Sequence, residues 1–195
     1  YVYSGQAEEI RRKMSGVHPY DPNINQVLRH RYDLTMRLLK CHLPAPARLL
    51  DIGEANPLSE HMGKCGYEII NTEGDLDDHP EIASTPADAV TAFEILEHLV
   101  APLPLLQSIR APLLIATVPL RLWFARAYRH PTDPRGRHYH EFEDWQFDWL
   151  LDKAGWVIVH REKWTSPTGW VGFRPLLRRI TPRYYAVVAR RKSPE

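Results

Sequence analysis

Short apolar runs alternate with amphipathic segments along most of the chain, and this alternation predicts strands that alternate with helices. Each apolar run is bounded by proline, glycine or polar residues, which is typical of buried strands in a parallel sheet. The predicted strands are residues 48–52, 67–72, 87–93 and 113–118. Strands and helices at this spacing predict an α/β fold with a doubly wound, mostly parallel sheet.

Apolar residues recur with a helical period in the segments around these strands. Helices are predicted at residues 6–15, 23–42, 58–65, 96–110 and 142–154. The fourth is broken by prolines, and the last has an apolar face made of Trp145, Phe147, Trp149, Leu150 and Leu151. The chain is therefore expected to open with helices before its first strand.

Two parts of the chain depart from simple alternation. Residues 76–86 are polar and contain proline, so a third strand there is expected to be short or missing. Residues 156–161 and 184–190 predict two final strands. The connection between those strands is expected to carry Trp164, Trp170 and Phe173.

The composition fits one domain in a reducing compartment. The chain has 195 residues, of which 44% are hydrophobic and 25% charged, enough for a core that folds alone. Two cysteines, Cys41 and Cys65, are too few for a disulfide framework or a zinc site, which favours the cytoplasm. No apolar run approaches the roughly 20 residues that a membrane span needs, and no signal peptide is visible.

The net charge of +1 hides an uneven distribution. Arginines gather at residues 121–137 and 174–192, whereas acidic residues gather at residues 73–97. The first basic segment could clamp a phosphate or carboxylate, or form a solvated loop. Residues 174–183 could lie on an acidic membrane surface or form a helix with snorkelling arginines. The nearly neutral total makes nucleic acid an improbable partner.

The turn after the first strand carries the strongest chemical signal. Asp51, Ile52 and Gly53 end the strand, and Pro57 can begin a helix. A tight turn of this kind brings backbone N–H groups and a helix N-terminus to a nucleotide-like ligand. However, the chain reads GEANPL where a dinucleotide site would have G-x-G-x-x-G.

Several segments, in order along residues 48–190, carry a family resemblance. They are LDIG at 50–53, Glu73 placed 22 residues after Asp51, ADAVTAFEILEHL at 87–99, LLIATVP at 113–119 and HYHEFEDWQFDWLLDKAGW at 138–156. With these segments the chain resembles the class I S-adenosylmethionine-dependent methyltransferases, in the small-molecule, type 11/23-like branch. The resemblance implies a Rossmann-like sheet of seven strands with an antiparallel final strand and helices on both faces.

The resemblance also implies a single methyltransferase-like domain over residues 1–195. Its parts would be an N-terminal helical cap (1–47), a cofactor-binding core (48–118) and a substrate-side segment with the closing strands (119–195). The implied cofactor is S-adenosylmethionine, with S-adenosylhomocysteine as the product. The residues expected to bind it are Asp51, Gly53, Glu54, Ala55, Glu73, Gly74, Asp75, Phe93 and Glu94.

Two of these acids have defined roles in the resemblance. Asp51 would touch the cofactor's amino group, directly or through water, and Glu73 would accept hydrogen bonds from the ribose hydroxyls. The alternatives are that Asp51 bonds turn amides at the strand end and that Glu73 is a solvated loop acid. Asp75 and Asp77 are close enough to replace Glu73 at the ribose.

Methyl transfer from a sulfonium is an in-line displacement, so a base is needed only if the acceptor must lose a proton. His138 and His140 are the first candidates for that base, followed by His98 and His130. Each of them could equally be a solvated loop histidine, and Glu97 and His98 could simply begin a helix. The pattern His138-x-His140-Glu141 is too common to indicate a metal site, so no metal is expected.

The sequence thus predicts a methyltransferase for a small-molecule acceptor, which could be anionic. One alternative is a catalytically inactive binding or scaffold protein, because Ala55 and Pro57 replace two glycines of the cofactor turn. Another is a nicotinamide-dependent oxidoreductase, which would need a second mononucleotide-binding half after the fourth strand.

Overall fold

One mixed sheet forms the centre of the computed structural model, which describes residues 26–126, 136–166 and 173–192. Its strands are β1 (Arg48–Asp51), β2 (Glu68–Asn71), β3 (Ala89–Phe93), β4 (Leu113–Pro119), β5 (Trp156–Thr165) and β6 (Pro182–Arg191). Among the described residues their order is β2-β1-β3-β4-β6-β5. The first four are mutually parallel, and β6 runs antiparallel to both of its neighbours. The predicted Rossmann-like sheet with an antiparallel final strand is therefore confirmed.

The sheet has six strands in the described part of the chain, not seven. Where the third strand was in doubt, the chain forms a short 3₁₀ helix, η1 (Pro80–Ser84). Asp77, just before it, accepts hydrogen bonds from the backbone N–H groups of Val100 (2.9 Å) and Ala101 (2.8 Å). Pro80 has no N–H group to donate to a neighbouring strand, which disfavours a strand here. The side chain of Asp77 instead accepts hydrogen bonds from a neighbouring loop and caps it.

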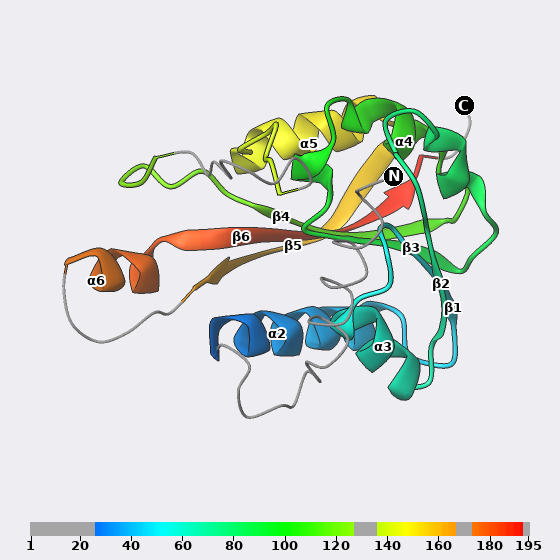
Figure 1. The fold of residues 1–195 in the computed structure, drawn as a ribbon, viewed down its shortest axis with the longest axis horizontal. Helices are drawn as coiled ribbons and strands as arrows, with labels where there is room; N and C mark the ends of the chain where they lie inside the picture. The colour runs from blue at the N-terminus through cyan, green and yellow to red at the C-terminus, as the bar shows by residue number, and fades with distance from the viewer. Residues whose placement is uncertain (1–25, 127–135, 167–172, 193–195) are drawn as a thin grey trace, which may run out of the picture.

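Helices cover both faces of the sheet (Figure 1). On one face lie α2 (Gln26–His42) and α3 (Pro57–Lys64); on the other lie α4 (Pro102–Ser108) and α5 (Asp144–Lys153). Neighbouring strand residues point to opposite faces. Leu49 packs in the cluster with Leu39 of α2, whereas Leu50 packs in the cluster with Leu105 of α4. Each such buried leucine stabilises the fold by about 1.5–3 kcal/mol.

The helix bounds differ from those predicted where proline intervenes. The helix predicted at residues 96–110 is broken by proline, as expected: it consists of η2 (Leu96–His98) and α4, and Pro102 occupies the first turn of α4. Within the described residues α2 begins at Gln26, and the helix predicted at residues 6–15 lies outside them.

The apolar face of α5 is narrower than predicted. Phe147 and Leu151 are buried, as expected for the side that meets the sheet. Trp145 and Trp149 are 47% and 69% exposed, and their rings pack edge to face with centroids 4.8 Å apart. The two tryptophans are one helical turn apart, so they contact each other rather than the core.

The chain between the last two strands also differs from the prediction. Trp164 was expected in the connection, but it lies within β5, which continues to Thr165 because β6 pairs with it over that length. Trp170 lies outside the described residues. Phe173 begins α6 (Phe173–Ile180), the helix that the basic segment was expected to form.

Helix α6 exposes the side chains of Phe173, Leu176 and Ile180 beside Arg178 and Arg179. Contact of this helix with a membrane surface stays a prediction. No helix of the described residues is long and apolar enough to cross a bilayer.

Candidate active site

The carboxyl ends of the parallel strands meet at one edge of the sheet, and the turn after β1 lies there. Gly53 has φ of +113°, a conformation that strains any residue with a Cβ. Its N–H donates to Thr72 Oγ1 (2.7 Å) beyond the end of β2. A Cβ at Gly53 would lie 3.6 Å from Ile95 Cδ1, so this turn approaches the loop that follows β3.

The helix after this turn caps its own N-terminus. Asn56 Oδ1 accepts hydrogen bonds from the N–H groups of Leu58 (2.9 Å) and Ser59 (3.1 Å), and Ser59 Oγ accepts from Asn56 N–H (2.9 Å). Pro57 is the first residue of α3, and Ala55 is exposed just before the cap. The cap therefore uses three backbone N–H groups that could otherwise meet a ligand.

Asp51 is 3% exposed and bonded within the sheet. Thr91 Oγ1 donates to Asp51 Oδ1 at 2.6 Å, and Asn71 Nδ2 donates to Oδ2 at 3.2 Å. Burial raises the pKa of Asp51 to about 6, and these two hydrogen bonds limit the rise. The Asp51 carboxylate thus accepts hydrogen bonds from side chains of the neighbouring strands. The alternative prediction, that it bonds the backbone amides of the turn, is not what the structure has.

The acidic loop after β2 faces solvent. Glu73 and Gly74 are exposed, and Gly74 has φ of +90° with open space where a Cβ would lie. Asp75 Oδ1 accepts from the N–H of Asp77 (2.9 Å), while the carboxylate of Asp77 caps the loop before α4. Asp77 is therefore committed to backbone amides, whereas Glu73 is exposed, and its binding of the ribose stays a prediction.

Glu94 follows Phe93 at the end of β3 and has φ of +55°, in the left-handed region that a glutamate rarely adopts. Its backbone N–H donates to the carbonyl of Thr117 at 3.0 Å. Its Oε2 pairs with Arg31 Nη1 of α2 at 3.2 Å. Burial raises the pKa of Glu94, and the charge of Arg31 opposes the rise. Arg31 carried no signal in the sequence, because 63 residues separate the two partners.

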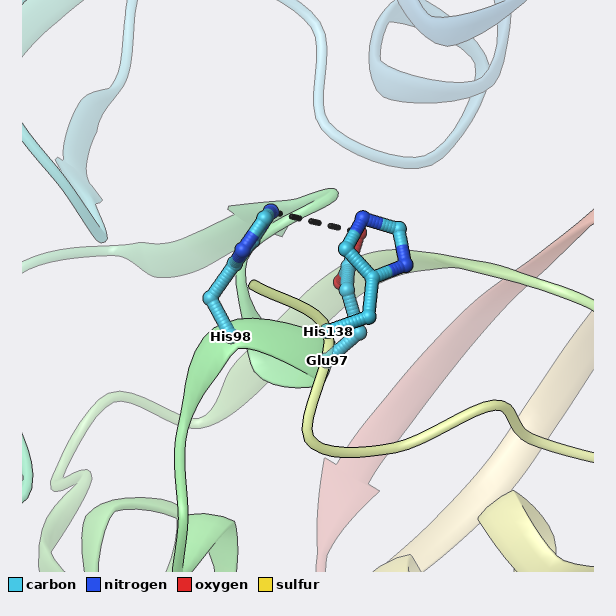
Figure 2. A group of neighbouring side chains, drawn as sticks. All are labelled: Glu97, His98 and His138. Atoms are coloured by element: carbon cyan, nitrogen blue, oxygen red, sulfur yellow. Dashed lines mark ion pairs between the residues drawn. The ribbon is translucent and has the colours of Figure 1, made fainter. Parts of the chain in front are cut away.

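A compact cluster beyond the end of β3 consists of Glu97, His98 and His138 (Figure 2). Glu97 and His98 belong to η2, and His138 comes from the segment before α5. The backbone N–H groups of Tyr139 (2.8 Å) and His140 (3.2 Å) both donate to the carbonyl of Glu97. These bonds hold His138 against η2, where the ring centroids of His98 and His138 are 4.7 Å apart.

The cluster combines a buried carboxyl group with two imidazoles. Glu97 is 1% exposed, and burial together with the charge of Glu94 raises its pKa well above the usual range. Burial, helped by His98 and Arg183, lowers the pKa of His138 to about 4, so this imidazole is neutral at pH 7. His98 Nδ1 lies 2.8 Å from the carbonyl of Arg137, which can only accept a proton, so Nδ1 is the donor.

His140 points away from this cluster. Its Nε2 donates to the carbonyl of Val100 at 3.2 Å, and its ring stacks on Phe142 with centroids 5.5 Å apart. The structure therefore brings His98 and His138 together and leaves His140 out. The pattern His138-x-His140-Glu141 does not converge either, and His130 lies outside the described residues.

A hollow of about 540 Å³ lies at the opposite edge of the sheet. Arg48, Glu68 and Asp88, at or next to the amino ends of β1, β2 and β3, contribute to its lining. Of the predicted site residues that the structure describes, none lines it. Ligands of open parallel sheets bind at the carboxyl ends of the strands, which is where the predicted residues are.

The family model that describes a methyltransferase domain matches residues 20–161 of the chain. The protein therefore belongs to the methyltransferase domain family, which confirms the resemblance and supports S-adenosylmethionine as the cofactor. A comparison with curated proteins finds no match.

Solved structures share the fold at low identity. The 1,6-didemethyltoxoflavin-N1-methyltransferase of Burkholderia thailandensis is 17% identical, with a TM-score of 0.53 over 83% of this chain and 78% of that one. A SAM-dependent methyltransferase of Archaeoglobus fulgidus is 14% identical, with a TM-score of 0.52 over 82% and 94%. The magnesium protoporphyrin IX methyltransferase of Synechocystis PCC 6803 is 14% identical, with a TM-score of 0.53 over 98% and 96%.

Proposed function

We propose that the protein transfers a methyl group from S-adenosylmethionine to a small-molecule acceptor. One observation carries the proposal: the turn at Gly53 approaches Ile95, in the loop that leads to the Glu97, His98 and His138 cluster. A cofactor held by the turn would thus lie next to groups able to take a proton. In this proposal residues 1–47 cap the site, residues 48–118 bind the cofactor and residues 119–195 face the acceptor.

The residues at this edge fit the cofactor. The left-handed Gly53 allows close approach of the backbone, Glu73 offers an exposed carboxylate for two ribose hydroxyls, and Asp51 provides negative charge for the amino group. When bound, the cofactor supplies an electrophilic methyl group on a sulfonium. The chain's contribution is to hold the acceptor in line and to remove its proton where that is needed.

His138 and His98 are the proposed proton acceptors. The low pKa of His138 leaves a neutral imidazole, which can accept a proton at pH 7. Positive side chains near the site favour an acceptor with a carboxylate or phosphate group. Arg121, Arg126 and Arg137, in the described part of the basic segment, are exposed.

Calorimetric titration with S-adenosylhomocysteine tests the proposal. Glu73→Ala removes charge-assisted hydrogen bonds of about 1.5–3 kcal/mol, so we expect binding about 10–100-fold weaker. Glu68→Ala, at the other end of β2, is the matched control and should bind like the unchanged protein. If the unchanged protein does not bind the ligand, the proposed function is wrong; equal binding by Glu73→Ala removes only the ribose assignment.

A methyltransferase fold that serves as a binding or scaffold protein is the second candidate. The capping box at Asn56 favours it, because α3 satisfies amides that would otherwise be free for a cofactor. This candidate predicts no calorimetric signal with S-adenosylhomocysteine. A nicotinamide-dependent oxidoreductase is disfavoured, because the antiparallel β6 lies next to β4 where a second parallel half would have to continue.

A further inference from the structure

We propose that Glu97, His98 and His138 bind a divalent transition-metal ion of the zinc type at the edge of the proposed acceptor site. One carboxylate and two imidazoles are a ligand set that suits zinc, iron, cobalt and manganese better than calcium or magnesium. Three protein ligands leave a coordination position for a water molecule or a substrate atom.

The positions of the ligand atoms support the site (Figure 2). One ligand atom from each residue lies within 4.8 Å of the others, and His98 Nε2 is 3.9 Å from Glu97 Oε1. Ligands held about 2.1 Å from a tetrahedral ion lie about 3.4 Å apart. Small rotations of the side chains are therefore enough to close the cluster around an ion.

The hydrogen bond of His98 to the backbone suits a metal ligand. Its Nδ1–H donates to the carbonyl of Arg137, so in the neutral ring the lone pair is on Nε2, the atom nearer Glu97. A metal-binding histidine commonly donates its other N–H to a carbonyl or carboxylate, which fixes the tautomer and the ring orientation. The structure has this second interaction in place.

A cation would also satisfy a buried carboxylate oxygen of the cluster. Glu97 Oε2 is buried and meets no hydrogen-bond donor among the described residues, and Glu97 itself is 1% exposed. A carboxylate in that position is costly unless a cation or donor meets it. Glu94 adds negative charge nearby, while Arg31 and Arg183 oppose it. The backbone bonds to the Glu97 carbonyl hold His138 close enough to share an ion with this carboxylate.

The open coordination position could bind an oxygen atom of the methyl acceptor; this role of the ion rests on the proposed function. With the ion bound, His98 and His138 would be ligands and no longer the proton acceptors of the metal-free site. An acceptor hydroxyl bound to the ion would instead release its proton to solvent water, because a bound cation lowers the pKa of an oxygen ligand. The ion would also orient that oxygen toward the methyl donor. The substrate class favoured by the site is therefore a small molecule with a hydroxyl, such as a phenol or a carboxylate-bearing alcohol.

Metal titration of the full chain tests the proposal. After treatment with chelator and dialysis, Zn²⁺ binding is measured by calorimetry and Co²⁺ binding by visible absorption. We expect one equivalent of either ion. Glu97→Gln removes one ligand and keeps the size of the side chain, and His138→Gln removes one ligand and keeps a polar side chain. Each variant should weaken binding of the metal ion by at least about tenfold.

His140→Gln is the matched control, because His140 lies two residues from His138 but outside the cluster. It should bind Zn²⁺ and Co²⁺ like the unchanged protein. The proposal is overturned if the unchanged protein binds neither ion, or if both ligand variants bind as tightly as it does. Circular dichroism reports folding; if Glu97→Gln fails to fold, His138→Gln decides. Binding of S-adenosylhomocysteine is measured in a separate titration. A failure of the proposed function can therefore be distinguished from a failure of the metal site.

Discussion

Replacing Asp51 by asparagine should change how the stability of the protein depends on pH. Asp51 is the buried carboxyl group at the end of β1, bonded by Thr91 and Asn71. Its pKa is raised from 3.8 to about 6, mainly because burial disfavours the charged form. Asparagine has an uncharged side chain of nearly the same shape, so Asp51→Asn removes the titration and little volume.

The size and sign of the effect follow from the raised pKa. The difference between 3.8 and about 6 corresponds to about 3 kcal/mol. Well below pH 3.8 the carboxyl group is protonated in both the folded and the unfolded chain, so the stabilising contribution is fully present. As the pH rises through about 6, ionisation of the carboxyl group stabilises the unfolded chain more than the folded chain, and that contribution is lost.

Urea unfolding at pH 4, 5, 6, 7 and 8 measures this effect. The free energy of unfolding of Asp51→Asn, minus that of the unchanged protein, should increase by about 2.4 kcal/mol between pH 4 and pH 7, because at pH 4 the carboxyl group of the unfolded chain is already partly ionised. Other titrating groups cancel in the difference. A difference that stays constant across this range would refute the raised pKa of Asp51 and its burial as the cause.

Three further experiments test other parts of the structure. Gly53→Ala should lower the free energy of unfolding by about 1–3 kcal/mol, because φ is positive at this position. Gly63→Ala, inside α3, should raise the free energy of unfolding by about 0.5–1 kcal/mol. Equal effects of the two substitutions would contradict the turn geometry. Arg31→Met should destabilise by about 3 kcal/mol because it leaves Glu94 unpaired. Adding Glu94→Gln should restore most of that loss in urea unfolding; no rescue would argue against the pair. Phe147→Ala should cost about 3–5 kcal/mol by opening a core cavity, and a loss below about 1 kcal/mol would place its ring outside the core.

Local patterns were sufficient to predict most of the fold. The apolar run before Gly53 and the proline after it predicted β1, the turn and α3 nearly to the residue. The antiparallel final strand came from the family resemblance, and the strand order was not predicted, because pairing between distant strands leaves no local pattern. The exposed Trp145 and Trp149 were placed wrongly, since periodicity locates an apolar face but does not show how wide the sheet beneath it is.

The candidate site was predictable only in part, for a similar reason. The turn around Asp51 and Gly53 is contiguous in sequence and was therefore visible. The meeting of His98 with His138 depends on contacts across about 40 residues, and so does the choice of His138 over His140. Residues two apart in an extended segment lie on the same side, so alternation alone does not separate His138 from His140. The bonds from that segment to the Glu97 carbonyl decide which histidine faces the cluster, and no local motif encodes them.

A crystal structure of the protein with S-adenosylhomocysteine is the most direct test of the proposed methyltransferase site. The predicted result is ligand density at the carboxyl edge of the sheet, with the methionine part at the Gly53 turn and the ribose at Glu73. The thioether sulfur should face the cluster of Glu97, His98 and His138. Density in the hollow beside Arg48 and Glu68, or none at a saturating ligand concentration, would contradict the assignment.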